Sequence, residues 1–303
     1  MSVDTAPPED SPMGISLNLN EIISTLKMLE YAPNSFSPLG FLTPDKFAEY
    51  DSSSGEASLK ERGLVSPGFD GPNFDPSYTK AFEVVCQPIF CTEVVNMSFK
   101  NETMDRVHYW GNEETIVKAQ LSEEGLKMSS PMPKKDWAST FCQNLLGKKN
   151  TTQAPLILPK TAYDLCLQFS LAVPNLPELN LSGLKTHIQS FGTMEDTHIE
   201  QIIEALHQVG ILHISNGANA PAFGHPMWQA LAQDKNIQVM IRDENGNANA
   251  MSFCGLPGNK ARVFANVNND PELLMATWPT AEDFRQELLD GLHIAEAPTD
   301  NNP

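Results

Sequence analysis

Four histidines in the second half of the chain are the side chains best suited to metal or acid–base chemistry: His198, His207, His213 and His225. Imidazole is a common zinc ligand and general base, so convergence with an acidic partner would indicate a metal site or catalysis. His198 and His207 are nine residues apart, which places them on different faces of a helix, and His213 begins a predicted strand. We therefore expect isolated imidazoles, with no metal site and no cofactor.

Sequence patterns for nucleophilic, phosphate-binding and metal chemistry are missing from the chain. The nucleophile elbow, the P-loop, the dinucleotide-binding glycine pattern, the zinc-protease helix and the EF-hand loop do not occur. Asp136 and Asp283 fall at the starts of predicted helices, where a carboxylate interacts favourably with the helix dipole. The sequence thus predicts that the chain is not an enzyme and has no catalytic residues.

A glycine-centred pattern of predicted elements occurs twice in the chain. Residues 59–65 and 206–212 each resemble the end of an amphipathic helix, a glycine after it (Gly63 or Gly210), and the start of an apolar strand. The two glycines are 147 residues apart, and the same offset aligns further segments. It pairs Trp110-Gly111-Asn112 with Pro257-Gly258-Asn259, and Asp136-Trp137 with Asp283-Phe284. We interpret this as an internal duplication.

Each unit is expected to contain helices followed by a β-meander and a closing helix. In the first unit the patterns predict helices at 15–31, 44–62, from Asp75-Pro76 onward and 133–146, and strands at 89–99, 105–110, 115–121 and 125–128. In the second unit they predict helices at 161–172, 181–191, 194–209, 221–232 and 279–292, and strands at 237–242, 248–254, 260–266 and 272–277.

The predicted fold class is α+β, with an internally duplicated pseudo-two-fold unit whose antiparallel meanders form one central sheet flanked by helices. The predicted organisation is a disordered tail at 1–14, unit one at 15–146, an exposed linker at 147–160, unit two at 161–293 and a disordered tail at 294–303.

Composition and charge narrow the classes of partner. The chain has 303 residues and is 41% hydrophobic, which suits a folded protein, and its formal charge of −18 repels phosphate backbones and anionic lipids. The segment preceding a winged-helix-like cadence, 198–207, contains no lysine or arginine, so DNA reading is not expected. No apolar run reaches the length of a membrane span. We expect neither nucleic-acid binding nor membrane insertion.

Cysteine usage and the N-terminal residues predict the compartment. The five cysteines, an odd number, show no CxxC spacing and mostly lie within apolar runs, which predicts reduced core thiols. Residues 1–13 are rich in proline and acid and lack the pattern of a signal peptide. A cytoplasmic location is therefore expected.

The order of motifs resembles one known family. An Ala-x-Leu-x-x-Arg-Gly-Leu-Val segment at 57–65, a following helix with Asp75-Pro76, Phe82 and Pro88, a meander and a closing helix are similar to the EspG chaperones associated with ESX (type VII) secretion in mycobacteria. The resemblance is architectural. It implies a pseudo-two-fold molecule with a central antiparallel sheet and helical bundles, which binds PE–PPE substrate pairs in the cytosol before export. No functional residue is carried over.

Function is expected to reside in protein binding. The two equivalent turns supply the candidate partner-binding residues Trp110, Glu113, Leu256 and Lys260, because loops on a rigid scaffold often carry recognition. We expect a non-enzymatic adaptor or chaperone, with a secretion substrate as one class of partner. An acidic immunity or inhibitor protein is the alternative, since negative charge speeds association with basic toxins. An enzyme with dispersed catalytic residues is the third hypothesis.

Overall fold

A single antiparallel sheet of eleven strands organises the structure, a computed structural model that describes residues 14–43, 45, 52–69, 71–98, 101–150, 153–164, 167, 189, 195–208, 210–215, 218–221 and 225–294. The strand order is β1-β7-β6-β5-β4-β12-β13-β14-β15-β9, and β8 also pairs with β6. The strands are β1 (Ile15–Leu17), β4 (Phe90–Ser98), β5 (Thr103–Gly111), β6 (Thr115–Ser122), β7 (Gly125–Met128), β8 (Met132–Pro133), β9 (Leu156–Pro159), β12 (Asn236–Asp243), β13 (Ala248–Cys254), β14 (Ala261–Val267) and β15 (Asp270–Thr277).

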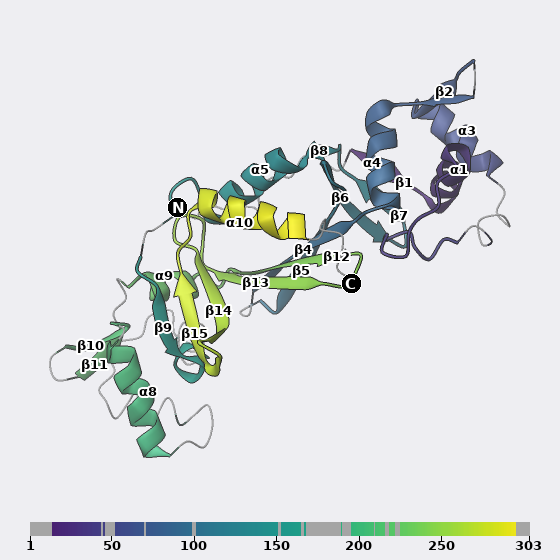
Figure 1. The fold of residues 1–303 in the computed structure, drawn as a ribbon. Coiled ribbons are helices and arrows are strands. Elements are labelled where there is room, and N and C mark those ends of the chain that lie inside the picture. The colour runs from purple at the N-terminus through teal and green to yellow at the C-terminus, as the bar shows by residue number, and fades with distance from the viewer. Residues whose placement is uncertain are drawn as a thin grey trace, which may run out of the picture.

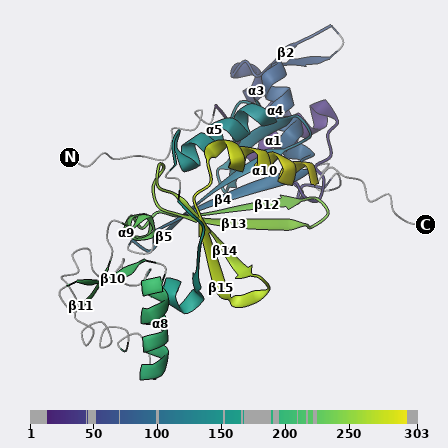
Figure 2. The ribbon, with the colours of Figure 1, turned by 60° about the vertical axis from the view of Figure 1, so that its left-hand side comes forward.

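Helices cover the sheet and form a lobe near each of its ends. They are α1 (Leu19–Leu29), α3 (Ser53–Glu61), α4 (Pro76–Cys86), α5 (Lys134–Leu146), α8 (Asp196–Gln208), α9 (Pro226–Ala232) and α10 (Ala281–Ile294). Two hairpins complete the lobes, β2 (Val65–Pro67) with β3 (Pro72–Phe74) and β10 (Leu212–Ser215) with β11 (Ala218–Pro221). Figures 1 and 2 show α5 and α10 side by side over one face of the sheet, with α1, α3 and α4 toward one end and α8 toward the other.

The predicted α+β class and the merged central sheet are confirmed. The two meanders join where β4 pairs with β12, from Phe90↔Asp243 to Met97↔Asn236, and each meander continues outward in the same order along the chain. Gly63 and Gly210 both adopt left-handed φ values, 69° and 75°, directly after α3 and α8. These features agree with the predicted duplication. The duplication itself stays a prediction, because a shared order of elements defines an architecture and not a common origin.

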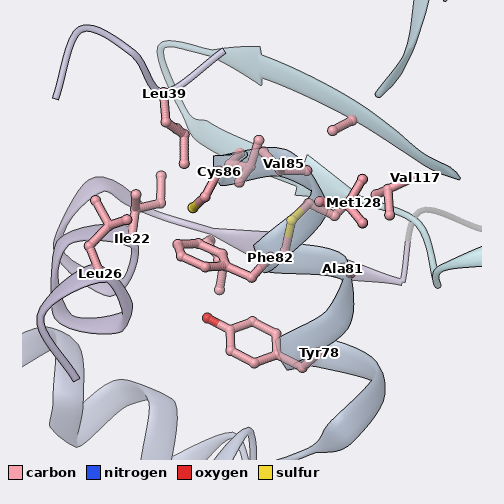
Figure 3. Packing of buried hydrophobic residues seen from close by; sticks show 14 of the residues in the cluster. Ile22, Leu26, Leu39, Tyr78, Ala81, Phe82, Val85, Cys86, Val117 and Met128 are labelled. Atoms are coloured by element: carbon pink, nitrogen blue, oxygen red, sulfur yellow. The ribbon is translucent and has the colours of Figure 1, made fainter. Parts of the chain in front are cut away.

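Three apolar cores hold the layers together. One core lies between α1, α4 and the strands β6 and β7, and Figure 3 shows Ile22 and Leu26 facing Phe82, with Val117 and Met128 behind. A second core lies between α8, α9 and the strands β9 and β13 to β15, and the third lies between the sheet and the pair α5 and α10. Neighbouring residues of an outer strand belong to different cores, as Ile116 and Val117 of β6 do, so both faces are packed toward the ends of the sheet. In the central strands β5 and β12, Arg106 and Arg242 are about half exposed.

Several predicted boundaries need correction. Residues 15–17 form the edge strand β1 and not the start of a helix, because Leu17 pairs with Leu126 of β7. The helix begins only after Asn18, whose side chain accepts the Glu21 backbone N–H at 3.0 Å while the Glu21 carboxylate accepts the Asn18 N–H at 2.9 Å. This reciprocal capping box fixes the start of α1.

The predicted linker is also part of the fold. Within 147–160, residues Leu156–Pro159 form β9 and pair with β15 at the end of the sheet, so the segment is not merely an exposed connector. The helix predicted at 221–232 is shorter, since β11 ends at Pro221 and α9 begins at Pro226. The helix predicted at 181–191, much of the one at 161–172, and the two tails apart from their innermost residues lie outside the described residues.

Four of the five cysteines are free and buried: Cys86, Cys91, Cys142 and Cys254. Burial raises the pKa of the Cys91, Cys142 and Cys254 thiols to about 12, and that of Cys86 further still. The prediction of reduced core thiols is confirmed for these four, and Cys166 lies outside the described residues.

Thiol labelling tests this arrangement. Because the thiolate is the reactive form, we expect a thiol-specific reagent at pH 7.5 to label at most one cysteine of the native protein, and all five after addition of denaturant. A Cys166→Ser variant serves as the control and should show no rapid labelling at all. Fast reaction of two or more native thiols would contradict the burial of the cysteines.

Candidate functional site

A cleft of about 620 Å³ lies between α5 and the face of the sheet that α5 and α10 cover. Its floor is formed by β4, β5 and β6, and its far wall by α5. The start of β12 and the loop between β13 and β14 line one end through Lys235, Leu256 and Lys260. Clefts of this volume are typical of sites for small organic ligands.

Aromatic side chains form the apolar wall of the cleft. Trp137 and Phe141, one turn apart on α5, are stacked with ring centroids 5.1 Å apart and an interplanar angle of 12°. Tyr109 of β5 completes the group, with its ring 5.3 Å from that of Trp137. The predicted helical spacing therefore places both α5 aromatics on the face that lines the cleft, where they present a flat apolar surface.

Lys260 is the most unusual polar residue of the cleft because it is only 2% exposed. Asn150 fixes its backbone: the Lys260 N–H donates to Asn150 Oδ1 at 2.8 Å, and Asn150 Nδ2 donates to the Lys260 carbonyl at 2.8 Å. Over the part of the chain that the structure describes, the Lys260 ammonium group has no hydrogen bond and no ion pair. Burial, assisted by the nearby charge of Lys235, lowers the pKa of Lys260 to about 8.

The charges around the cleft have the opposite sign to the whole protein. Three lysines, Lys118, Lys235 and Lys260, line it together with one acidic residue, Asp105. The chain as a whole has a formal charge of −18. A local surplus of positive charge within an acidic protein indicates a site suited to an anionic group.

The structure brings together two of the four predicted partner-binding residues. Leu256 and Lys260 both line the cleft. Their loop does not project, because the Gly258 N–H donates to the Leu146 carbonyl at the end of α5, at 2.7 Å. The second of the two equivalent turns therefore packs against the end of a helix.

The other two predicted residues lie elsewhere. Trp110 packs against the core of the first lobe, with its ring 5.8 Å from that of Phe36 and 6.1 Å from that of His108. Its indole N–H is buried and has no hydrogen-bond partner within the described residues. Glu113 is exposed on the turn between β5 and β6. Neither residue lines the cleft that Leu256 and Lys260 share.

Phe69 is a candidate binding residue that the sequence reasoning missed. It lies between β2 and β3 and is fully exposed, although Val65 and Phe74 at the base of the same hairpin are buried in the core. A signal was present in the sequence, since an aromatic residue stands between the turn residues of Gly68-Phe69-Asp70-Gly71. The patterns predicted the start of an apolar strand after Gly63 and no hairpin before Asp75-Pro76.

The histidines do not assemble a metal site in the described part of the chain. No group of three or more His, Cys, Asp or Glu residues is arranged to hold a metal ion there. His225 caps α9, where its Nδ1 accepts the Met227 N–H at 3.1 Å and burial lowers its pKa.

Comparisons with known protein families and sequences do not indicate a function for this chain. A scan against protein-family models finds no match to this chain, and a search of curated protein sequences finds none either. Among the described residues, no helix has both the length and the apolar character needed to cross a bilayer.

Proposed function

We propose that this chain is a non-enzymatic adaptor or chaperone that holds another protein, and that the β2–β3 hairpin is the element that grips the partner. The observation that carries this proposal is the complete exposure of Phe69 at the end of that hairpin. In keeping with the family resemblance, the proposed partner is a secretion substrate held in the cytoplasm before export.

The hairpin combines a rigid base with an apolar tip. Val65 pairs with Phe74, and both side chains are buried with α3 and α4. The Gly68 N–H donates to the Gly71 carbonyl at 2.9 Å, which closes the turn around Phe69. A preorganised hairpin loses little conformational entropy on binding. Little of the free energy gained by burying the aromatic side chain at its tip is therefore offset by ordering of the backbone.

The size of the expected contribution is substantial. Full burial of a phenylalanine side chain is worth about 1.5–3 kcal/mol, and aromatic residues are frequent among the side chains that dominate interfaces. The hairpin projects from the first lobe, as Figure 1 shows at β2, where a partner can approach it without displacing another element.

A partner-capture experiment with a matched control tests the proposal. Tagged wild-type protein, Phe69→Ser and Met104→Ser are used to purify partners from the native cells, and the affinity of each recovered partner is then measured with purified components. Met104 is the control because it is another exposed apolar residue, 57% accessible, and lies on β5. We expect Phe69→Ser to weaken binding by about 2 kcal/mol, roughly thirtyfold, and Met104→Ser to leave it within about twofold.

Two results would overturn the proposal. One is a partner that binds wild-type protein and Phe69→Ser with equal affinity while the variant retains its fold by circular dichroism. The other is the absence of any protein that is enriched with wild-type over Phe69→Ser in cells that express both at equal level.

A further inference from the structure

The buried ammonium group of Lys260 is the feature of the molecule that the proposed function leaves unused. A lysine that is only 2% exposed and has no counter-ion within the described chain is unfavourable, because burial removes the hydration of its charge. The backbone of Lys260 is nevertheless held in place by two hydrogen bonds with the Asn150 side chain, which donates one and accepts the other. The position of this residue is therefore well determined, while no acidic side chain among the described residues pairs with its charge.

The residues around Lys260 indicate what kind of ligand could compensate its positive charge. Lys260 lines the cleft of about 620 Å³ beneath α5, together with the stacked rings of Trp137 and Phe141. A ligand that brings one negative charge to the lysine and one flat or extended apolar group to the aromatic wall would satisfy both ends of the cleft. A charge-assisted hydrogen bond in such a low-dielectric site is stronger than one in water.

We propose that the cleft between α5 and the sheet binds an amphipathic monocarboxylate, with its carboxylate against Lys260 and its apolar group against Trp137 and Phe141. Lys235, exposed at the same end of the cleft, adds a second positive charge to the entrance. A phosphate ester fits less well, because its two negative charges would need several charged donors in the buried part of the cleft, and Lys260 is the one buried lysine of the three that line it. An apolar amine is disfavoured by the positive charges of the lysines.

This site is independent of the proposed protein-binding hairpin. The cleft lies under α5, and Phe69 does not line it. The β2–β3 hairpin that carries Phe69 belongs to the first lobe, where Figure 1 shows β2 projecting. A protein partner held through Phe69 and a carboxylate held by Lys260 can therefore be measured separately, and the failure of one proposal leaves the other unaffected.

Calorimetric titration of the full-length protein at pH 7 tests the proposal with two carboxylates of different shape, 2-naphthoate and decanoate. The neutral analogues 2-naphthamide and decanamide share the apolar group and lack the charge. We expect at least one carboxylate to bind roughly tenfold or more tightly than its amide, the range for a hydrogen bond to a charged group. Acetate and inorganic phosphate should show no saturable binding at the same concentrations, because they lack the apolar group.

Matched lysine variants assign the carboxylate to Lys260. Lys260→Met should lose roughly tenfold or more of the carboxylate affinity and leave the amide affinity within about twofold. Lys127→Met is the control, because Lys127 is a partly exposed lysine on β7 that pairs with Glu124 at 3.3 Å and does not line the cleft. It should leave both affinities unchanged.

A measurement on unmodified protein covers the case in which Lys260→Met does not fold. The groups whose charges act on Lys260 are Lys235 and the Cys254 thiol. Because burial holds the pKa of free Lys260 at about 8, carboxylate affinity should fall by about tenfold per pH unit above that value, while amide affinity stays constant. The proposal is overturned if neither carboxylate binds, if the amides bind equally well, or if the carboxylate affinity is the same in Lys260→Met or between pH 7 and pH 10.

Discussion

Replacing Arg106 and Arg242 together with methionine is expected to lower the free energy of unfolding by about 3 kcal/mol. Both guanidinium groups contact the carboxylate of Glu93, Arg106 Nη1 at 3.1 Å and Arg242 through a short ion pair. Glu93 is buried on β4, at the seam where the two meanders join. Loss of both arginines leaves the buried carboxylate beside His108 alone among the described basic residues, with Nε2 3.9 Å away and a pKa that burial lowers. Breaking a buried ion pair in this way costs about 3–5 kcal/mol. The low end applies because the arginines are half exposed and water can take their place.

Both arginines are replaced, and not the glutamate, because Glu93 is buried while Arg106 and Arg242 are about half exposed. Glu93→Met should cost less than the double arginine variant, because the two arginines can turn to solvent once their partner is gone. The triple variant with all three residues changed to methionine should recover part of the lost stability. Chemical denaturation monitored by tryptophan fluorescence measures all three. Equal destabilisation by Glu93→Met and by the double arginine variant would contradict this explanation. It would show that the lost free energy of unfolding comes from the ion pairs themselves and not from burying an unpaired carboxylate.

Replacing Lys260 with methionine is expected to stabilise the protein at pH 7 by up to about 3 kcal/mol. Burial lowers the pKa of Lys260 from 10.5 to about 8, and a difference of that size corresponds to about 3 kcal/mol. Methionine has a similar length and carries no charge, so it fills a similar volume and removes the cost of burying the ammonium group.

The pH dependence gives this prediction a signature that altered packing would not produce. Between about pH 8 and pH 10.5 the unfolded chain holds a proton that folded Lys260 has lost, so Lys260 makes stability rise with pH in that window. The advantage of Lys260→Met over wild type should therefore be greatest below pH 8 and should shrink toward pH 10.5. Cys254 is the cysteine whose charge interacts with Lys260, and burial raises its pKa to about 12. Loss of Lys260 would raise that pKa further, so the folded Cys254 thiol stays protonated in both proteins below pH 10.5 and does not contribute to the difference. A stability difference that does not change with pH would contradict the lowered pKa of Lys260.

The types and order of most elements could be predicted from the sequence, because their signals are local. Strand and turn patterns predicted the strands of both meanders, and the turn residues Glu244-Asn245-Gly246-Asn247 separate the end of β12 from the start of β13. Asp75 and Pro76 predicted the start of α4, where the Asp75 side chain accepts the Tyr78 N–H at 2.9 Å. Each of these signals needs only neighbours within a few residues.

The edge strands β1 and β9 and the short β2–β3 hairpin were not predicted, because they form through contacts with segments distant in the sequence. Three or four residues of Ile15–Leu17 or Leu156–Pro159 are too few to show a period, and they become strands only because β7 and β15 offer unpaired backbone groups. The hairpin that exposes Phe69 is equally short, and its base is set by core contacts with α3 and α4.

The candidate site was harder to predict from local sequence than the helices and strands were. Spacing alone determined that Trp137 and Phe141 share one face of α5, since residues four apart lie on the same side of a helix. What that face covers was decided by the tertiary structure. Lys260 looked like an exposed turn residue, but Asn150, 110 residues earlier in the chain, holds its backbone, and the end of α5 receives its loop. The burial of a charge depends on which distant segments surround it, and the spacing of residues along the chain does not contain that information.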